Sequence, residues 1–260
     1  MRASILGLVA FLTLPLAPTA APATPCTTAT PECTEWVAIK GGPARSMIYR
    51  TYSLDTRNDQ IKRALIMVHG TNRNADHYFD SARAAAFLAG AITDTIVISP
   101  RIASNNGSCK DTLAPNEVSW SCGGDSWKSG GNAISNPELS SFDFVDDILR
   151  KLANKKIFPN LQAIVVAGHS AGGQFANRYS MANKVHGTLG VPITYVVANP
   201  SSYAWPDATR PTPVDDALPE NAVKAWRARP CTRSSRSAPP TRRSARTTTG
   251  GRRASRIARP

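Results

Sequence analysis

The sequence predicts an α/β fold, a doubly wound and mostly parallel sheet with helices on both faces. Short apolar segments alternate with longer amphipathic ones, which is the order expected when each strand is followed by a helix. The segments at 64–68 and 163–167 are continuously apolar, as in strands that are buried on both faces. Polar residues and glycines follow these segments directly, so an active site is expected at the carboxyl ends of the strands.

The periodicity of apolar residues predicts the elements in order. The expected strands lie at 36–39, 46–53, 64–68, 95–99, 163–167 and 193–198. The expected helices run from Asn74 or Asp76 to about Ala89, from Ser140 or Ser141 to Lys156, and over the segment after Ser170. Residues 101–140 show little periodicity, and a connection of this length is usually functional.

The first 23 residues have the features of a secretory signal peptide. Arg2 gives a positive start, residues 5–16 are apolar but short for a bilayer, and Ala21-Pro22-Ala23 forms an A-x-A cleavage site. An N-terminal membrane anchor is the alternative. No other segment of the sequence is apolar over about 18 residues, so we expect a secreted protein without a membrane span.

The five cysteines fit an exported protein. Cys26 and Cys33 lie close together, and Cys109 and Cys122 bracket a loop rich in Asn, Gly and Ser. We expect these neighbours to pair, although four cysteines allow three connectivities. Closing a loop of about 13 residues stabilises a fold by about 3 kcal/mol in the chain-entropy model. Cys231 has no expected partner.

The net charge of +13 is concentrated at the C-terminus. Residues 227–260 contain eleven arginines and no acidic residue, whereas the rest of the chain contains 20 basic and 18 acidic residues. Arg, Ser, Thr, Pro, Ala and Gly make up almost all of this tail, so we expect it to be disordered. The folded domain is expected at 34–226. Because this domain is nearly neutral, we expect no specific binding of nucleic acid.

Residues 168–172 read Gly-His-Ser-Ala-Gly between a predicted strand and a predicted helix. In that context G-x-S-x-G indicates a nucleophile elbow, a sharp turn that holds a serine hydroxyl above the sheet. Gly168 and Gly172 leave room where the strand and helix backbones approach each other. The helix N-terminus after Ser170 favours a negative oxygen above it. An ordinary serine in a glycine-rich turn is the alternative.

Three segments together resemble the α/β-hydrolase superfamily, in a secreted esterase- or lipase-like branch. They read ALIMVHGTN, GHSAGG and ITYVVANPSSY, and the resemblance covers about residues 36–210. It implies that Ser170 is the nucleophile. It also implies that the backbone N–H groups of Ala171 and Thr71 form an oxyanion hole, with Asn72 as the alternative to Thr71.

The chain departs from the family pattern after the elbow. The family places its acid and then its histidine after the serine. The chain has four histidines, and only His186 follows Ser170, by sixteen residues. We expect His186 near the end of a helix, far from the strand tips. Asp207 is the candidate acid, with Asp215 and Asp216 as alternatives, and no histidine is assigned to the triad.

The sequence therefore predicts an α/β-hydrolase-like domain that lacks its last strands and its triad histidine. The composition changes near residues 225–230, so we expect a chain that is C-terminally truncated or frameshifted. A hydroxyl is a poor nucleophile without a base, so activity is expected to be impaired.

Two functions fit these residues. The first is a secreted serine hydrolase that cleaves small or polymeric carboxylic esters through an acyl-enzyme on Ser170. The second is a non-catalytic hydrolase-like protein whose basic tail contacts anionic polymers or surfaces. We expect no cofactor and no metal site, and the acyl group, the alcohol and the oligomeric state stay open.

Overall fold

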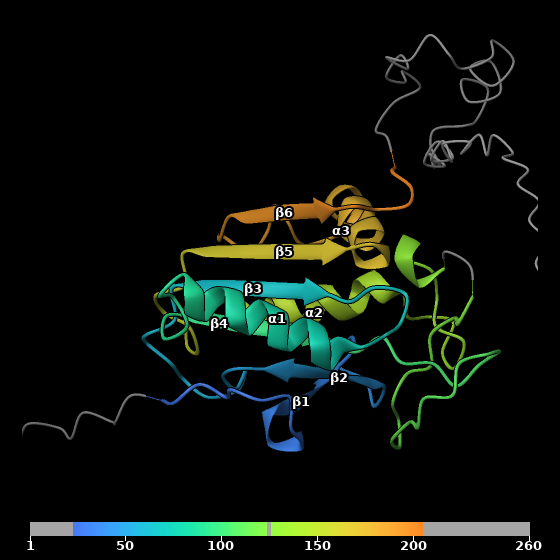
Figure 1. Cartoon of the computed structure of the whole chain (residues 1–260), viewed down its shortest axis with the longest axis horizontal. Helices are drawn as coiled ribbons and strands as arrows, with labels where there is room; N and C mark the ends of the chain where they lie inside the picture. The colour runs from blue at the N-terminus through green and yellow to red at the C-terminus, as the bar shows by residue number, and fades with distance from the viewer. Residues whose placement is uncertain (1–22, 124–125, 205–260) are drawn as a thin grey trace, which may run out of the picture.

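The computed structural model describes residues 23–123 and 126–204 (Figure 1). The expected cleavage site is therefore described only at its last residue, Ala23. Asp207, Asp215, Asp216, Cys231 and the basic tail lie outside the described residues.

Within these ranges six strands form one mixed sheet in the order β1-β2-β4-β3-β5-β6. The first two strands pair antiparallel with their neighbours, and the other pairs are parallel. This arrangement confirms the predicted α/β fold. The strands are β1 (Thr34–Ala38), β2 (Arg45–Arg50), β3 (Arg63–Val68), β4 (Thr95–Pro100), β5 (Ala163–His169) and β6 (Ile193–Ala198).

Three α-helices lie in the described part of the chain. They are α1 (Ala75–Leu88), α2 (Ser141–Leu152) and α3 (Ala171–Ala182). Two short 3₁₀-helices, η1 (Pro31–Cys33) and η2 (Trp127–Ser129), accompany them. Figure 1 shows α1 in front of the sheet.

The core divides into two apolar clusters, one on each face of the sheet. Ile96 and Ile98 of β4 belong to the larger cluster, with α2 and α3, whereas Val97 joins the cluster under α1. Successive side chains of a strand point to opposite faces, so the helices must cover both sides of β4. All six residues of β4 are buried, which explains the unbroken apolar run Ile96-Val97-Ile98 at its centre.

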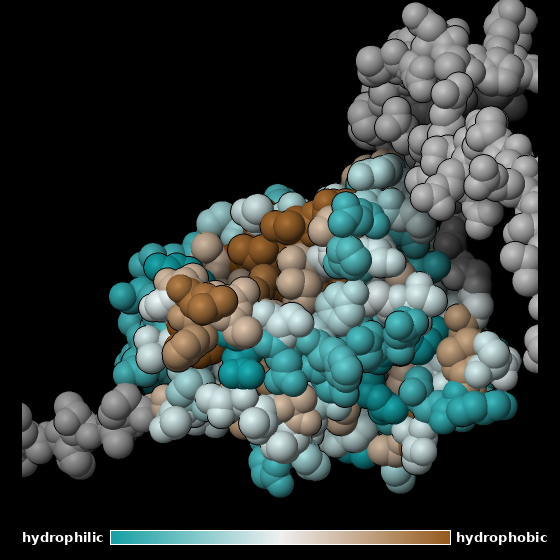
Figure 2. Space-filling model, viewed as in Figure 1, coloured by the Kyte–Doolittle hydropathy of each residue, from teal (hydrophilic) through white to brown (hydrophobic). Residues whose placement is uncertain are grey.

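The face under α1 is only partly covered. This helix packs against β2, β3 and β4, and Figure 2 shows apolar side chains exposed beside it. Large exposed apolar residues include Phe87 and Leu88 at the end of α1 and Val196 on β6.

Two elements were predicted to extend further along the chain than they do. The second helix ends at Leu152 rather than Lys156, because the chain turns at Asn154, whose carbonyl accepts from the N–H of Phe158 (2.9 Å), a fully buried residue. Strand β2 ends at Arg50 rather than Ser53. The side-chain oxygen of Thr51 accepts from the N–H of Val97 (2.9 Å) and replaces a backbone acceptor there.

Two disulfides join Cys26 to Cys33 and Cys109 to Cys122, the local pairs expected from the sequence. The Cα atoms of each pair are 5.6 Å apart. None of the described helices combines the length and the apolar character needed to span a bilayer. The disulfides are compatible with an extracellular protein.

Helix α2 begins with a capping box that can be tested by substitution. The side chain of Ser140 accepts from the N–H of Asp143 (3.1 Å), and the Asp143 carboxylate accepts from the N–H of Ser140 (2.8 Å). We expect Ser140→Ala to lower the free energy of unfolding by about 1 kcal/mol in urea titrations. Ser81→Ala is the control. The Ser81 hydroxyl bonds back to the carbonyl of His77 within α1, so its loss leaves stability nearly unchanged.

Candidate active site

The loops after β3 and β5 leave the sheet side by side. Val68 pairs with Gly168 at the ends of these parallel strands. His69 and Gly70 therefore begin one loop next to His169, the last residue of β5, and Ser170, which follows it. The phenol of Tyr78 on α1 lies over this junction, 3.5 Å from Nδ1 of His169.

Ser170 stands in a sharp, strained turn between β5 and α3. Its φ of 57° and ψ of −119° lie in a region that side chains rarely adopt. Two backbone bonds hold this conformation: the N–H of Ser170 donates to the carbonyl of Ala198 on β6 (3.0 Å), and its own carbonyl accepts from Gln174 (3.0 Å). Strain of this kind persists only where the surroundings fix it, and it is frequent at functional sites.

Three glycines let the start of α3 approach the strand ends. A Cβ on Gly168 would lie 2.1 Å from the carbonyl oxygen of Gly172, and one on Gly172 would lie 2.1 Å from that of Val68. Gly173 meets the same limit, 2.4 Å from the carbonyl oxygen of Ala198. Any side chain at these positions would push the helix off the sheet. The sequence motif identified the first two glycines and missed the third.

The hydroxyl of Ser170 is partly exposed and forms no hydrogen bond with any described residue. Ala171, the first residue of α3, is 98% buried. Its N–H has no intrahelical acceptor, because the first amides of a helix are unpaired. The turn thus places a free hydroxyl beside a free donor.

The loop after β3 supplies further donors. The N–H of Arg73 donates to the carbonyl of Gly70 (3.2 Å), which closes a tight turn around Thr71 and Asn72. Both turn residues are exposed. Within the described ranges no acceptor lies within hydrogen-bonding distance of either N–H group.

A model of a known protein family matches residues 65–258 and is described as the alpha/beta hydrolase family. This chain belongs to the alpha/beta hydrolase family. The match contains both loops described above.

Three solved structures are similar to this chain. Poly(aspartic acid) hydrolase-1 from Sphingomonas sp. KT-1 is 21% identical over 73% of this chain, with a TM-score of 0.43. A hyperthermophilic esterase from the archaeon Pyrobaculum calidifontis is 18% identical over 68%, with a TM-score of 0.36. The siderophore hydrolase EstA from Aspergillus nidulans is 16% identical over 74%, with a TM-score of 0.35.

The chain spans 65%, 46% and 62% of these three proteins, less than two thirds of each. A comparison with curated proteins finds no match.

His69 of this alpha/beta hydrolase is a structural residue. It is fully buried, its Nδ1 donates to the carbonyl of Gly70 (2.8 Å), and its Nε2 accepts from the N–H of Ile102 (3.1 Å). Both ring nitrogens are therefore occupied. Burial lowers the pKa of His69 to about 4, so the ring is neutral at pH 7.

The other three histidines contact groups other than the Ser170 hydroxyl. His77 is exposed on α1, and His169 is exposed at the elbow itself. His186 follows α3 and stacks on Tyr195 of β6, whose hydroxyl lies 3.2 Å from its Nδ1. His186 thus lies four residues after the last residue of α3, close to the end of that helix as expected from the sequence. None of the four forms a hydrogen bond with Ser170 within the described structure.

Two polar residues of α3 form hydrogen bonds with the loop after β6. The amide nitrogen of Gln174 donates to the hydroxyls of Ser201 (2.6 Å) and Ser202 (2.7 Å), and Arg178 also donates to Ser202 (2.7 Å). Gln174 and Arg178 are almost fully buried. Buried polar groups need such partners, so this loop has a defined position beside the elbow.

Sequence reasoning missed Arg73, Gly173, Gln174 and Arg178. The sequence could have indicated Gln174 and Arg178. They are four residues apart, so they lie on one face of a helix, directly beside the apolar pair Phe175 and Tyr179. The candidate acid, Asp207, lies outside the described residues. Among the described residues, no group of three or more His, Cys, Asp or Glu side chains could hold a metal ion.

The close approach at Gly172 gives a first prediction for the site. We expect Gly172→Ala to lower the free energy of unfolding by about 3 kcal/mol or more, because its Cβ would meet backbone rather than a movable side chain. Chemical denaturation measures this loss. Gly187→Ala is the control: a Cβ there meets nothing within 4 Å, so stability should stay constant or rise by up to about 1 kcal/mol.

His69 gives a second prediction, on the pH dependence of stability. The unfolded histidine binds a proton below a pH of about 6.5, whereas the folded one does so only below a pH of about 4. Stability is therefore complete above this window and falls by about 3 kcal/mol as the pH drops through it. Denaturation of His69→Gln across the same window should lack this part of the slope. His77→Gln should keep it, and an unchanged slope in His69→Gln would contradict the assignment.

Proposed function

We propose that this alpha/beta hydrolase is a serine esterase in which Ser170 attacks the acyl carbonyl of carboxylic esters. The main support is the strained turn that leaves the Ser170 hydroxyl free of hydrogen bonds directly before the unpaired N–H of Ala171. Such a turn has unfavourable backbone energy, and in enzymes of acyl transfer a turn of this kind presents the serine hydroxyl to the substrate.

Ala171 and Thr71 serve as the oxyanion donors in this proposal. Attack by Ser170 turns the ester carbonyl oxygen into an oxyanion, which needs N–H donors at fixed positions. The N–H of Ala171 starts α3, and that of Thr71 lies in the turn closed by Arg73. Each donor of this kind lowers the barrier by about 3 kcal/mol. Asn72 offers the alternative N–H in the same turn.

The described residues provide no general base to remove the hydroxyl proton of Ser170. A serine needs a base, and no described histidine reaches Ser170. We therefore propose that acylation occurs with activated esters and that the acyl-enzyme turns over slowly. Enzymes stripped of a triad member keep about 10³- to 10⁴-fold acceleration over water from binding and the oxyanion hole. Asp207 remains the proposed acid.

We also propose that the protein acts outside the cell, on small or polymeric esters. The two disulfides support an oxidising compartment. The missing base favours one other candidate function, a non-catalytic hydrolase-like protein that holds anionic polymers or surfaces through its eleven C-terminal arginines.

Reaction with p-nitrophenyl butyrate separates these candidates. We expect a burst of about one p-nitrophenol per chain, a butyryl adduct on Ser170 by mass spectrometry, and slow turnover afterwards. Ser170→Ala should abolish the burst and the butyryl adduct, and Ser81→Ala on α1 should behave like the wild type. A wild type that forms no adduct, together with salt-sensitive binding to an anionic polymer that is lost on deletion of 227–260, would favour the non-catalytic function.

A further inference from the structure

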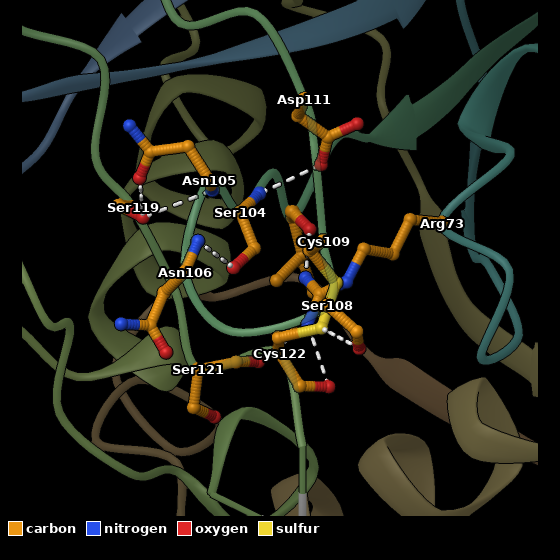
Figure 3. The surroundings of a disulfide bond; sticks show 11 residues. Arg73, Ser104, Asn105, Asn106, Ser108, Cys109, Asp111, Ser119, Ser121 and Cys122 are labelled. Atoms are coloured by element: carbon orange, nitrogen blue, oxygen red, sulfur yellow. Dashed lines mark hydrogen bonds between the residues drawn. A yellow bond between two sulfur atoms is a disulfide. The ribbon is translucent and has the colours of Figure 1, made fainter.

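Arg73 connects the turn around Thr71 to the long connection between β4 and α2. Its backbone adopts a left-handed φ of 57°, unusual for a residue with a side chain. Its guanidinium donates to the carbonyls of Ile102 and Ser121 and, at 3.4 Å, to that of Cys122. Figure 3 shows this side chain pointing at the Cys109–Cys122 disulfide.

Ile102, just after β4, is held from two sides by the same loop. Its N–H donates to Nε2 of His69 (3.1 Å), and its carbonyl accepts from Nη1 of Arg73. His69 and Arg73, at the two ends of the loop that contains Thr71, therefore both bind Ile102 at the end of β4. This double contact fixes the loop relative to β4.

The position of the other acceptors depends on the disulfide. Ser121 and Cys122 belong to a connection that folds back on itself, where the N–H of Trp120 donates to the carbonyl of Ala103 (2.9 Å). The bond from Cys122 to Cys109 closes this fold. The disulfide therefore adds a covalent tie directly beside Ser121, next to the backbone bond of Trp120.

Hydrogen bonds to backbone carbonyls, rather than an ion pair, hold the guanidinium of Arg73. In the described ranges no carboxylate lies within ion-pair distance of Arg73, and its face lies 5.6 Å from the ring centre of Trp127. Burial lowers the pKa of Arg73, yet guanidinium stays charged in proteins. A planar fork can reach two separate carbonyls at once, which a lysine cannot do.

We propose that Arg73 is a positioning residue for the oxyanion turn and that the Cys109–Cys122 disulfide acts on the active site through it. The proposal rests on the function proposed above. The backbone turn at Thr71 is closed by a single bond of 3.2 Å, so the direction of its free N–H groups depends on the anchored side chain at its end.

Labelling of Ser170 with a fluorophosphonate tests the effect on reactivity. The Ser170 oxygen bonds to phosphorus, the P–F bond breaks, fluoride leaves, and the hydroxyl proton passes to solvent, so no acyl-enzyme hydrolysis is needed. We expect Arg73→Gln and Arg73→Lys to lower the maximal rate kinact about 10- to 100-fold while the half-saturating concentration KI stays constant. Arg50→Ala is the matched control, because Arg50 is also part-buried but bonds to Glu35 on β1.

The disulfide is tested with a paired set of variants. Replacing Cys109 and Cys122 together by Ser should lower kinact as Arg73→Gln does, and the combined variant should show little further loss, because both act on one contact. Replacing Cys26 and Cys33 together by Ser removes the other disulfide and should leave kinact unchanged. A full additive loss, or wild-type kinact in Arg73→Lys, would overturn the proposal.

Hydrogen exchange at the amide of Ile102 provides a readout that is independent of reactivity. We expect exchange to speed up about 10-fold in Arg73→Gln and in the Cys109/Cys122 variant, but not in the Cys26/Cys33 variant. If the wild type is never labelled at Ser170, the proposed esterase function fails, and exchange at Ile102 alone decides the coupling. Unchanged exchange in the first two variants would refute it.

Discussion

The close approach of one helix to three strand ends is the constraint on which the rest of this structure depends. The first turn of α3 touches the ends of β3, β5 and β6 through Gly172, Gly168 and Gly173. Because no side chain separates these backbones, the chain has to reverse within the single residue Ser170. The unusual φ of that serine and the unpaired amides that follow it are consequences of this packing.

A second layer of contacts gives the neighbouring loops defined positions. His69 and Arg73 hold the β3 loop against Ile102, and Gln174 with Arg178 holds the β6 loop against α3. Each of these side chains is at least half buried and bonded to backbone or hydroxyl groups. The side chains that anchor these loops therefore lie in the protein interior, although Thr71 and Asn72 remain exposed.

Much of the fold could be predicted from the sequence, because strand burial on both faces gives a continuous apolar pattern that few other structures produce. The sharp turn at Ser170 was equally visible, since Gly168 and Gly172 are a local steric requirement. Arg73 could not be predicted, because its acceptors lie between 29 and 49 residues away in a connection without periodicity. Helix α2 was predicted too long because lysines are common at helix ends, whereas the burial of Phe158 decides where the chain turns.

The elbow also limits how this protein can evolve. Of the six residues from Gly168 to Gly173, His169 is exposed, Ser170 is partly exposed and the other four are buried. A mutant library across this turn would therefore yield functional diversity at one position. Changes in ligand preference are more accessible through the exits of β3, β4 and β6, whose outer residues can vary while their anchors stay fixed.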